Sequence, residues 1–147
     1  MSNEYQAEFV RLIKRLSNLM NQRIDDVLKA HGMARSQFQV LYVINKSGSL
    51  TQKQLLETLN VEPATLSGLI DTLETKRLVK RSIAASDKRS KKLALTRSGQ
   101  KIVDGIPHPG RLIEKSMLKG VSDPDRKVFE KVCTKLIDNL QSEILTK

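Results

Sequence analysis

The sequence predicts a mainly α-helical protein that carries one small β-hairpin. Near both ends of the chain, apolar residues recur at spacings of three and four, the pattern of amphipathic helices. In the middle, the β-prone runs 78–83 and 91–95 enclose a basic segment, which predicts a hairpin with a charged tip. The 147 residues are enough for one domain. We therefore expect a single domain over 1–147, with a compact module at 36–96 and helical regions at 1–35 and 97–147.

The charge balance favours a polyanionic partner. Twenty-six basic and 16 acidic residues give a formal net charge of +10, which suits nucleic acid or an acidic membrane surface. No apolar run approaches the roughly 20 residues that a membrane-spanning helix needs, and the charged N-terminus does not resemble a signal peptide. We therefore expect a cytoplasmic protein that is not inserted in a membrane.

The residue types for catalysis or metal binding do not occur together in this sequence. We find no Gly-rich phosphate loop, nucleophile elbow or acid–base pair, so we expect no enzyme and no cofactor. His31 and His108 lack the paired spacing of a metal site. Cys133, the only cysteine, lies in an apolar stripe, where we expect a buried small hydrophobe; a redox-sensing thiol would need exposure and cationic neighbours.

Three helices are expected before residue 61. The first covers residues 3–31 and ends at Gly32, a typical C-terminal glycine. Ser36, with Gln39 three residues later, predicts the start of the second helix as a capping box. Residues 49–50 are too short for more than one rung of a strand. Thr51 and Gln54 repeat the capping-box pattern at the start of the third helix, which ends in a tight turn at residues 60–61.

A fourth helix is expected over residues 63–76, and we call it the reading helix. Pro63 suits its first position, and four apolar residues, Leu66, Leu69, Ile70 and Leu73, form its buried stripe. The side chains left near its start are small and mostly hydroxylated, which allows close approach to base edges. Taken alone, the pattern favours an ordinary amphipathic helix with a polar face.

The hairpin after this helix favours DNA binding. A helix, a turn, a helix and a charged hairpin form the layout of a winged helix-turn-helix, which places its second helix in a DNA major groove. The alternative for the basic tip is a merely solvated surface. We expect DNA contacts from the start of the third helix, the reading helix and the hairpin, namely Thr51, Gln52, Lys53, Pro63, Ala64, Thr65, Ser67, Gly68, Thr72, Arg81, Asp87, Lys88, Arg89, Ser90 and Lys91.

The rest of the chain is expected to be helical with one break. Thr96 caps a helix that cannot continue through residues 106–110, IPHPG, and helix should resume over 112–119. Ser122 caps the last helix. The first and last helices carry longer apolar stripes than the module can cover, which predicts a dimer interface. The alternative is that these two helices pair within one chain.

The hairpin also resembles that of a known family. Residues 87–96, DKRSKKLALT, match the wing signature D-x-R-x-x-x-L-x-L-T of the MarR family of bacterial transcription regulators. Ser36, Gln37, Phe38 and Leu41 are similar to that family's second helix, and residues 69–74 are similar to the end of its reading helix. Arg77 departs from the pattern, because family members usually have glycine there, so we expect this helix to end differently.

The resemblance implies a fold and a function. The fold is a winged helix-turn-helix plus a helical dimerisation region, in which the first helix interleaves with the last two of a partner. An ion pair between Arg81 and Asp87 would hold the wing, and Arg89 would enter the minor groove. A small-molecule effector would bind between the two regions, near Leu16, Met33, Phe38 and Tyr42.

We therefore expect a sequence-specific transcriptional regulator. It would bind a pseudo-palindromic operator in double-stranded DNA as a homodimer, most simply as a repressor released by a ligand. The alternative is a winged-helix module for protein–protein interaction without specific DNA binding. A role at a membrane surface is weaker, because the basic residues gather on the hairpin.

Overall fold

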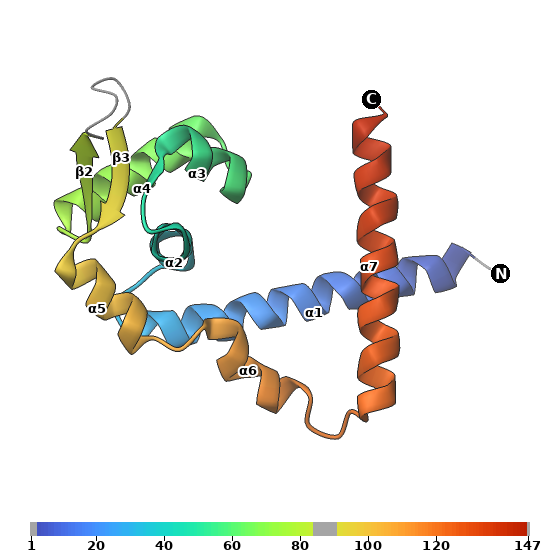
Figure 1. The fold of residues 1–147 in the computed structure, drawn as a ribbon. Coiled ribbons are helices and arrows are strands. Elements are labelled where there is room, and N and C mark those ends of the chain that lie inside the picture. Colours follow the sequence, from blue (N-terminus) through green and yellow to red (C-terminus); the bar gives the residue numbers. More distant parts are fainter. Residues whose placement is uncertain (1–2, 84–90, 147) are drawn as a thin grey trace. The chain divides into compact units, whose positions relative to one another are not determined.

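The computed structural model describes residues 3–83 and 91–146, with the side chains of residues 3–6 and Ile83 left aside. It is mainly α-helical with a small sheet, as predicted (Figure 1). The elements are α1 (Asn3–Lys29), α2 (Arg35–Ser47), β1 (Leu50–Thr51), α3 (Gln52–Leu59), α4 (Pro63–Thr75), β2 (Val79–Ile83), β3 (Lys91–Leu95), α5 (Arg97–Gly105), α6 (Pro109–Met117) and α7 (Asp123–Leu145).

The chain divides into two compact units, residues 1–113 and 114–147. The first contains α1 to α5, the sheet and the start of α6, and the second contains the end of α6 and α7. That the two units act as one domain stays a prediction. Within the residues described, no helix is both long and apolar enough to cross a membrane.

Helix α2 is the centre of the first unit. It contacts α1, α3, α4, α5 and β3, and Figure 1 shows it end-on among these elements. Val40, Leu41 and Ile44 on this helix are fully buried, and each such side chain stabilises the fold by roughly 1.5–3 kcal/mol. The core around α2 consists of Leu28, Met33, Phe38, Val40, Leu41, Ile44, Leu50, Leu55, Leu66, Ile70, Leu73, Leu78, Val79, Leu93, Val103 and Ile106.

The connection from α1 to α2 differs from the predicted one in its cap. Gly32 has φ +67°, and the Met33 amide donates to the carbonyl oxygen of Leu28 at 3.0 Å, so the predicted glycine end of α1 is confirmed. The predicted cap at Ser36 is wrong. The cap lies two residues earlier, at Ala34, whose amide donates to Oε1 of Gln37 at 3.4 Å, and α2 begins at Arg35. Only Met33 and Ala34 separate Gly32 from the start of α2, so the helix begins before a hydroxyl residue is reached.

The sheet has three antiparallel strands in the order β1-β3-β2. Its register pairs Leu50 with Leu93, and Val79 with Leu95. The expected single rung at residues 49–50 is therefore the two-residue strand β1, which starts at Leu50. Leu50, Val79 and Leu93 are buried, so one face of the hairpin root closes the core around α2.

The helix after the sheet breaks at the prolines, as predicted. Helix α5 ends at Gly105, and α6 begins at Pro109. The predicted restart at residue 112 comes too late, because a proline suits the first position of a helix, where an amide proton has no partner. The Thr96 cap is confirmed, since its hydroxyl accepts from the Gly99 amide at 3.0 Å.

Helix α7 leaves its apolar stripe uncovered. The Ser122 cap is confirmed, because its hydroxyl accepts from the Asp125 amide at 3.2 Å. None of residues 123–145 is buried, and Cys133, expected to be buried, is only partly so. The exposed apolar side chains of α7 are Val128, Phe129, Val132, Ile137, Leu140, Ile144 and Leu145. Helix α1 exposes Phe9, Val10, Leu12, Ile13 and Leu19 in the same way.

Candidate nucleic-acid interface

Helices α3 and α4 form the helix-turn-helix, and the local sequence fixes where each begins and where α3 ends. The predicted capping box is confirmed, because the Thr51 hydroxyl accepts from the Gln54 amide at 3.2 Å and Oε1 of Gln54 accepts from the Thr51 amide at 2.9 Å. Asn60 ends α3 with φ +50°, a conformation that asparagine tolerates better than most residues. Pro63 then occupies the first turn of α4.

Burial fixes which face of α4 is presented to solvent. Leu66, Ile70 and Leu73 are completely buried. The opposite face is exposed, and it carries Pro63, Ala64, Thr65, Gly68, Asp71, Thr72 and Thr75. Five residues of α4 that we expected at the interface therefore lie on one open surface, namely Pro63, Ala64, Thr65, Gly68 and Thr72.

Ser67 and Gln52 have a different position. Nε2 of Gln52 donates to Oγ of Ser67 at 2.9 Å in a partly buried contact between α3 and α4. The two residues hold the helices together, a structural role that the sequence did not predict because it depends on tertiary packing. Lys53, the next residue of α3, is exposed.

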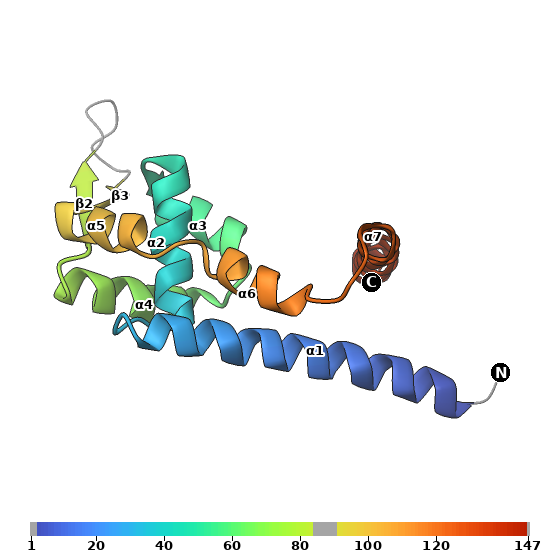
Figure 2. The ribbon, with the colours of Figure 1, turned by 90° about the horizontal axis from the view of Figure 1, so that it is seen from below.

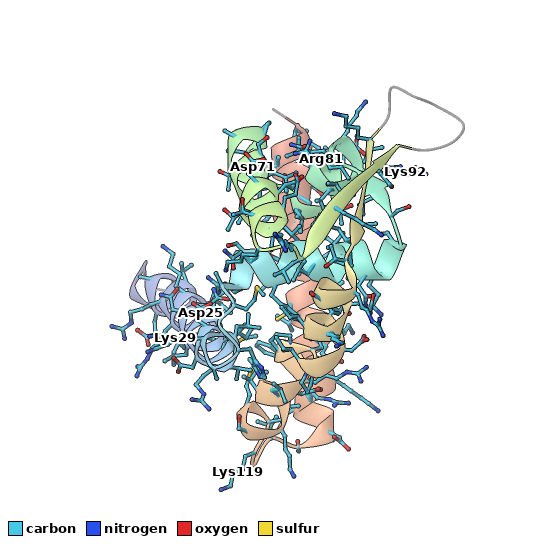
Figure 3. The ribbon with its side chains drawn as sticks, turned by 90° about the vertical axis from the view of Figure 1, so that its left-hand side faces the viewer. Asp25, Lys29, Asp71, Arg81, Lys92 and Lys119 are labelled. Atoms are coloured by element: carbon cyan, nitrogen blue, oxygen red, sulfur yellow. The ribbon has the colours of Figure 1, made fainter. Side chains whose placement is uncertain are left out.

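Arg81 ties the root of the hairpin to α4. Its Nε donates to Oε1 of Glu74 at 2.7 Å, and its Nη2 lies 3.7 Å from Oδ1 of Asp71. Figure 3 shows Arg81 on β2 beside Asp71 on α4. Exposed pairs of this kind contribute about 0–1 kcal/mol, so their main effect here is orientation.

The tip of the hairpin lies outside the described residues. This applies to Asp87, Lys88, Arg89 and Ser90, so the predicted Arg81–Asp87 pair and the role of Arg89 stay predictions. At the edge of the described part, Lys91 begins β3 and is exposed. The neighbouring Lys92 is half-buried and pairs with Thr51 across the sheet.

The end of α4 corrects the expectation for Arg77. Arg77 adopts φ +57°. The Leu78 amide donates to the carbonyl oxygen of Leu73, and the Arg77 amide to that of Glu74, both at 2.9 Å. These are the two bonds of a glycine-type helix end. The helix therefore ends as it would with glycine, and the left-handed conformation of Arg77 costs about 1 kcal/mol. The Thr96 hydroxyl holds the turn by donating to the Arg77 carbonyl oxygen at 2.7 Å.

A pocket beside α2 contains two of the four residues expected to bind an effector. Phe38 and Tyr42 line a space of about 230 Å³ together with Arg35 and His108. The His108 ring meets Tyr42 edge-on, with 5.0 Å between the ring centroids. Met33 lines a separate pocket, and Leu16 lines neither of these two. Sequence analysis missed His108, although its place in the helix break was a signal.

Comparison with known proteins identifies the family. A family model described as MarR family matches residues 31–90. The uncharacterized HTH-type transcriptional regulator YwoH of Bacillus subtilis is 30% identical over 120 residues, which cover 82% of this chain and 87% of that protein. The chain belongs to the MarR family.

Solved structures of MarR-family proteins have the same fold. The S. aureus MepR–DNA complex aligns with a TM-score of 0.77 and 27% identity, covering 90% of this chain and 97% of that chain. A mutant MarR from E. coli complexed with operator DNA aligns with a TM-score of 0.75 and covers 88% of this chain and 93% of its own. Its 22% identity supports the fold alone. The chain thus has the fold of a MarR-family transcriptional regulator.

Proposed function

We propose that this MarR-family chain is a repressor that binds double-stranded DNA as a homodimer and releases it when a small molecule binds. The observation that carries this proposal is the open face of α4, presented beside a basic hairpin in a chain of net charge +10. The opposite face of α4 is buried in the core, which fixes the rotation of the helix about its axis and keeps the open face toward solvent. MepR, which shares this fold, was solved in complex with DNA, and that supports DNA as the partner.

The contacts divide into two kinds. Helix α4 enters the major groove, and Lys53 and Lys91 flank it as exposed cations that meet phosphates. Phosphate contacts release counterions, so the affinity should fall steeply with salt concentration. The hairpin tip, with Lys88 and Arg89, reaches the adjacent minor groove, as the sequence predicts.

The homodimer explains the apolar surfaces that the chain leaves uncovered. Phe129 and Leu140 on α7 are 48% and 62% exposed, and Leu12 on α1 is 55% exposed. Large apolar side chains exposed along a helix in this way mark an interaction site. A two-fold dimer places its two α4 helices about 34 Å apart and requires a pseudo-palindromic operator.

The effector acts through the pocket beside α2. Phe38, Tyr42 and His108 supply aromatic walls, and Arg35 supplies a positive charge. Because α2 contacts both the α5 helix and the DNA-binding helices, a ligand held here changes the spacing of the two α4 helices. That change weakens DNA binding without any contact between ligand and DNA.

A gel-shift titration tests the proposed function. The full-length chain is mixed with a labelled fragment of the DNA upstream of its own gene and with excess nonspecific competitor DNA. A discrete band that survives the competitor supports sequence-specific binding. If only competitor-sensitive smearing is seen, the proposal is wrong, and a winged-helix module for protein interaction becomes the better description.

A further inference from the structure

Helix α4 has none of the side chains that usually read purines. Guanine is read by arginine or lysine and adenine by asparagine or glutamine, through paired hydrogen bonds in the major groove. The sequence of α4 is PATLSGLIDTLET, which contains none of these four residue types. Selection of bases by α4 must therefore use other chemistry.

Two of the hydroxyl protons on the open face of α4, those of Thr72 and Thr75, are already engaged within the protein. Oγ1 of Thr72 donates to the carbonyl oxygen of Gly68, and Oγ1 of Thr75 donates to that of Asp71, both at 2.9 Å. Each hydroxyl has one proton, so neither threonine has one left for a base. Oγ of Ser67 accepts from Nε2 of Gln52 and is partly buried, so it lies away from the centre of this face. What Thr72 and Thr75 present outward is therefore mainly a methyl group.

Gly68 leaves the backbone bare in the middle of this face. A Cβ atom on Gly68 would meet nothing within 4 Å, so packing inside the protein does not require glycine there. Glycine in a helix interior costs about 0.5–1 kcal/mol relative to alanine. Close approach of another molecule to the backbone would account for glycine at this position.

The one charge on this face is partly balanced. Asp71 lies 3.7 Å from Nη2 of Arg81, which also binds Glu74. Arg81 therefore lies beside both carboxylates, Asp71 and Glu74, and reduces their repulsion of DNA phosphates. The face presented to DNA is close to neutral and rich in methyl groups.

We propose that α4 selects its half-site through the C5-methyl groups of thymine, which project into the major groove. The methyl groups of Ala64 and Thr72 pack against thymine methyls, and the bare backbone at Gly68 allows the approach. Apolar contact from alanine or threonine is a recognised way to read thymine. This inference rests on the proposed function, because it describes how the same interface chooses its sequence.

Replacement of thymine by deoxyuridine tests the inference, because it removes only the methyl group. Duplexes are first selected from a random pool by the full-length chain, and each thymine of the selected half-site is then replaced in turn. Loss of one buried methyl should weaken binding roughly fourfold, and replacement of the same thymine in both half-sites roughly fifteenfold. Thymines outside the half-site should tolerate the change.

Two variants at one position provide the matched control. Thr72→Ser keeps the hydroxyl and removes the methyl. For the thymine that Thr72 contacts, this variant should bind the thymine duplex and the deoxyuridine duplex with nearly equal affinity. Thr72→Val keeps a methyl and removes the hydroxyl, so it should still bind the thymine duplex more tightly than the deoxyuridine duplex.

Three outcomes would count against the inference. Selective binding with no response to deoxyuridine would overturn it and leave the proposed function standing. A required cytosine whose preference disappears in Asp71→Asn would also overturn it, because a carboxylate then reads the base. If no sequence is selected from the pool, the inference falls together with the proposed function.

Discussion

Only glycine fits at position 99, because a backbone carbonyl group occupies the place of a Cβ atom. A Cβ atom at this position would overlap the carbonyl oxygen of Leu78, which accepts from the Thr96 amide at 3.0 Å. This contact joins the end of α4, the end of the hairpin and the start of α5. Gly99→Ala should therefore lower the free energy of unfolding by roughly 2–3 kcal/mol, as overpacking against backbone does. Urea denaturation at a fixed protein concentration measures the loss.

Gly105 supplies the control on the same helix. A Cβ atom there would meet nothing within 4 Å, so Gly105→Ala should be neutral or stabilise by up to about 1 kcal/mol. Equal losses in the two variants would show that helix propensity, and not the contact with Leu78, sets the requirement for glycine.

Arg77 has a backbone conformation that suits its side chain poorly. With φ +57°, it holds a position that glycine adopts without strain. Arg77→Gly should raise the free energy of unfolding by about 1 kcal/mol. Arg77→Ala keeps the Cβ atom and loses only the exposed side chain, so its stability should stay near that of the parent. If both variants change stability alike in thermal unfolding, the charge and not the backbone is responsible.

At the scale of single elements, the sequence predicted what local chemistry decides. The caps at Thr51, Thr96 and Ser122 each depend on a hydroxyl and an amide three residues later, so they were predicted correctly. The predicted cap at Ser36 was wrong, because α2 starts earlier, after Ala34. The Gln52–Ser67 hydrogen bond was not predicted, because 15 positions separate the two residues in the sequence.

The candidate interface also combines features set by local sequence with features set by tertiary packing. Periodicity identified the open face of α4, since its buried leucines repeat at helical spacing. It did not predict that Arg81 binds Glu74, or that the threonine hydroxyls return to the helix backbone. Side-chain hydrogen bonds of this kind depend on rotamers and on neighbouring elements, which a pattern of residue types does not specify.

Helix α7 gives a prediction for the dimer. Leu136 is partly buried, and Leu140 is 62% exposed in the isolated chain. Replacing both with glutamate would place two charges in an apolar interface at a cost of several kcal/mol. We expect Leu136→Glu combined with Leu140→Glu to give a monomer at micromolar concentration in sedimentation velocity.

The opposite face of α7 supplies the matched control. Thr134 and Ser142 are exposed and lie away from the apolar stripe, and their hydroxyls donate only to backbone within the helix. Thr134→Glu combined with Ser142→Glu adds the same two charges, and this variant should remain dimeric. A dimer in the leucine variant would show that α7 lies outside the interface.

For the whole molecule, a net charge of +10 raises the question of whether DNA binding depends on total charge or on particular cations. Arg89→Ala and Lys101→Ala each lower that charge by one, but only Arg89 belongs to the predicted wing tip, whereas Lys101 is exposed on α5. The proposed contact of Arg89 in the minor groove would contribute about 1–3 kcal/mol per site and would occur twice in the proposed dimer. Arg89→Ala should therefore weaken operator binding at least tenfold and flatten its salt dependence, while Lys101→Ala changes little. Fluorescence anisotropy over a salt series measures both, and equal effects would show that total charge is responsible.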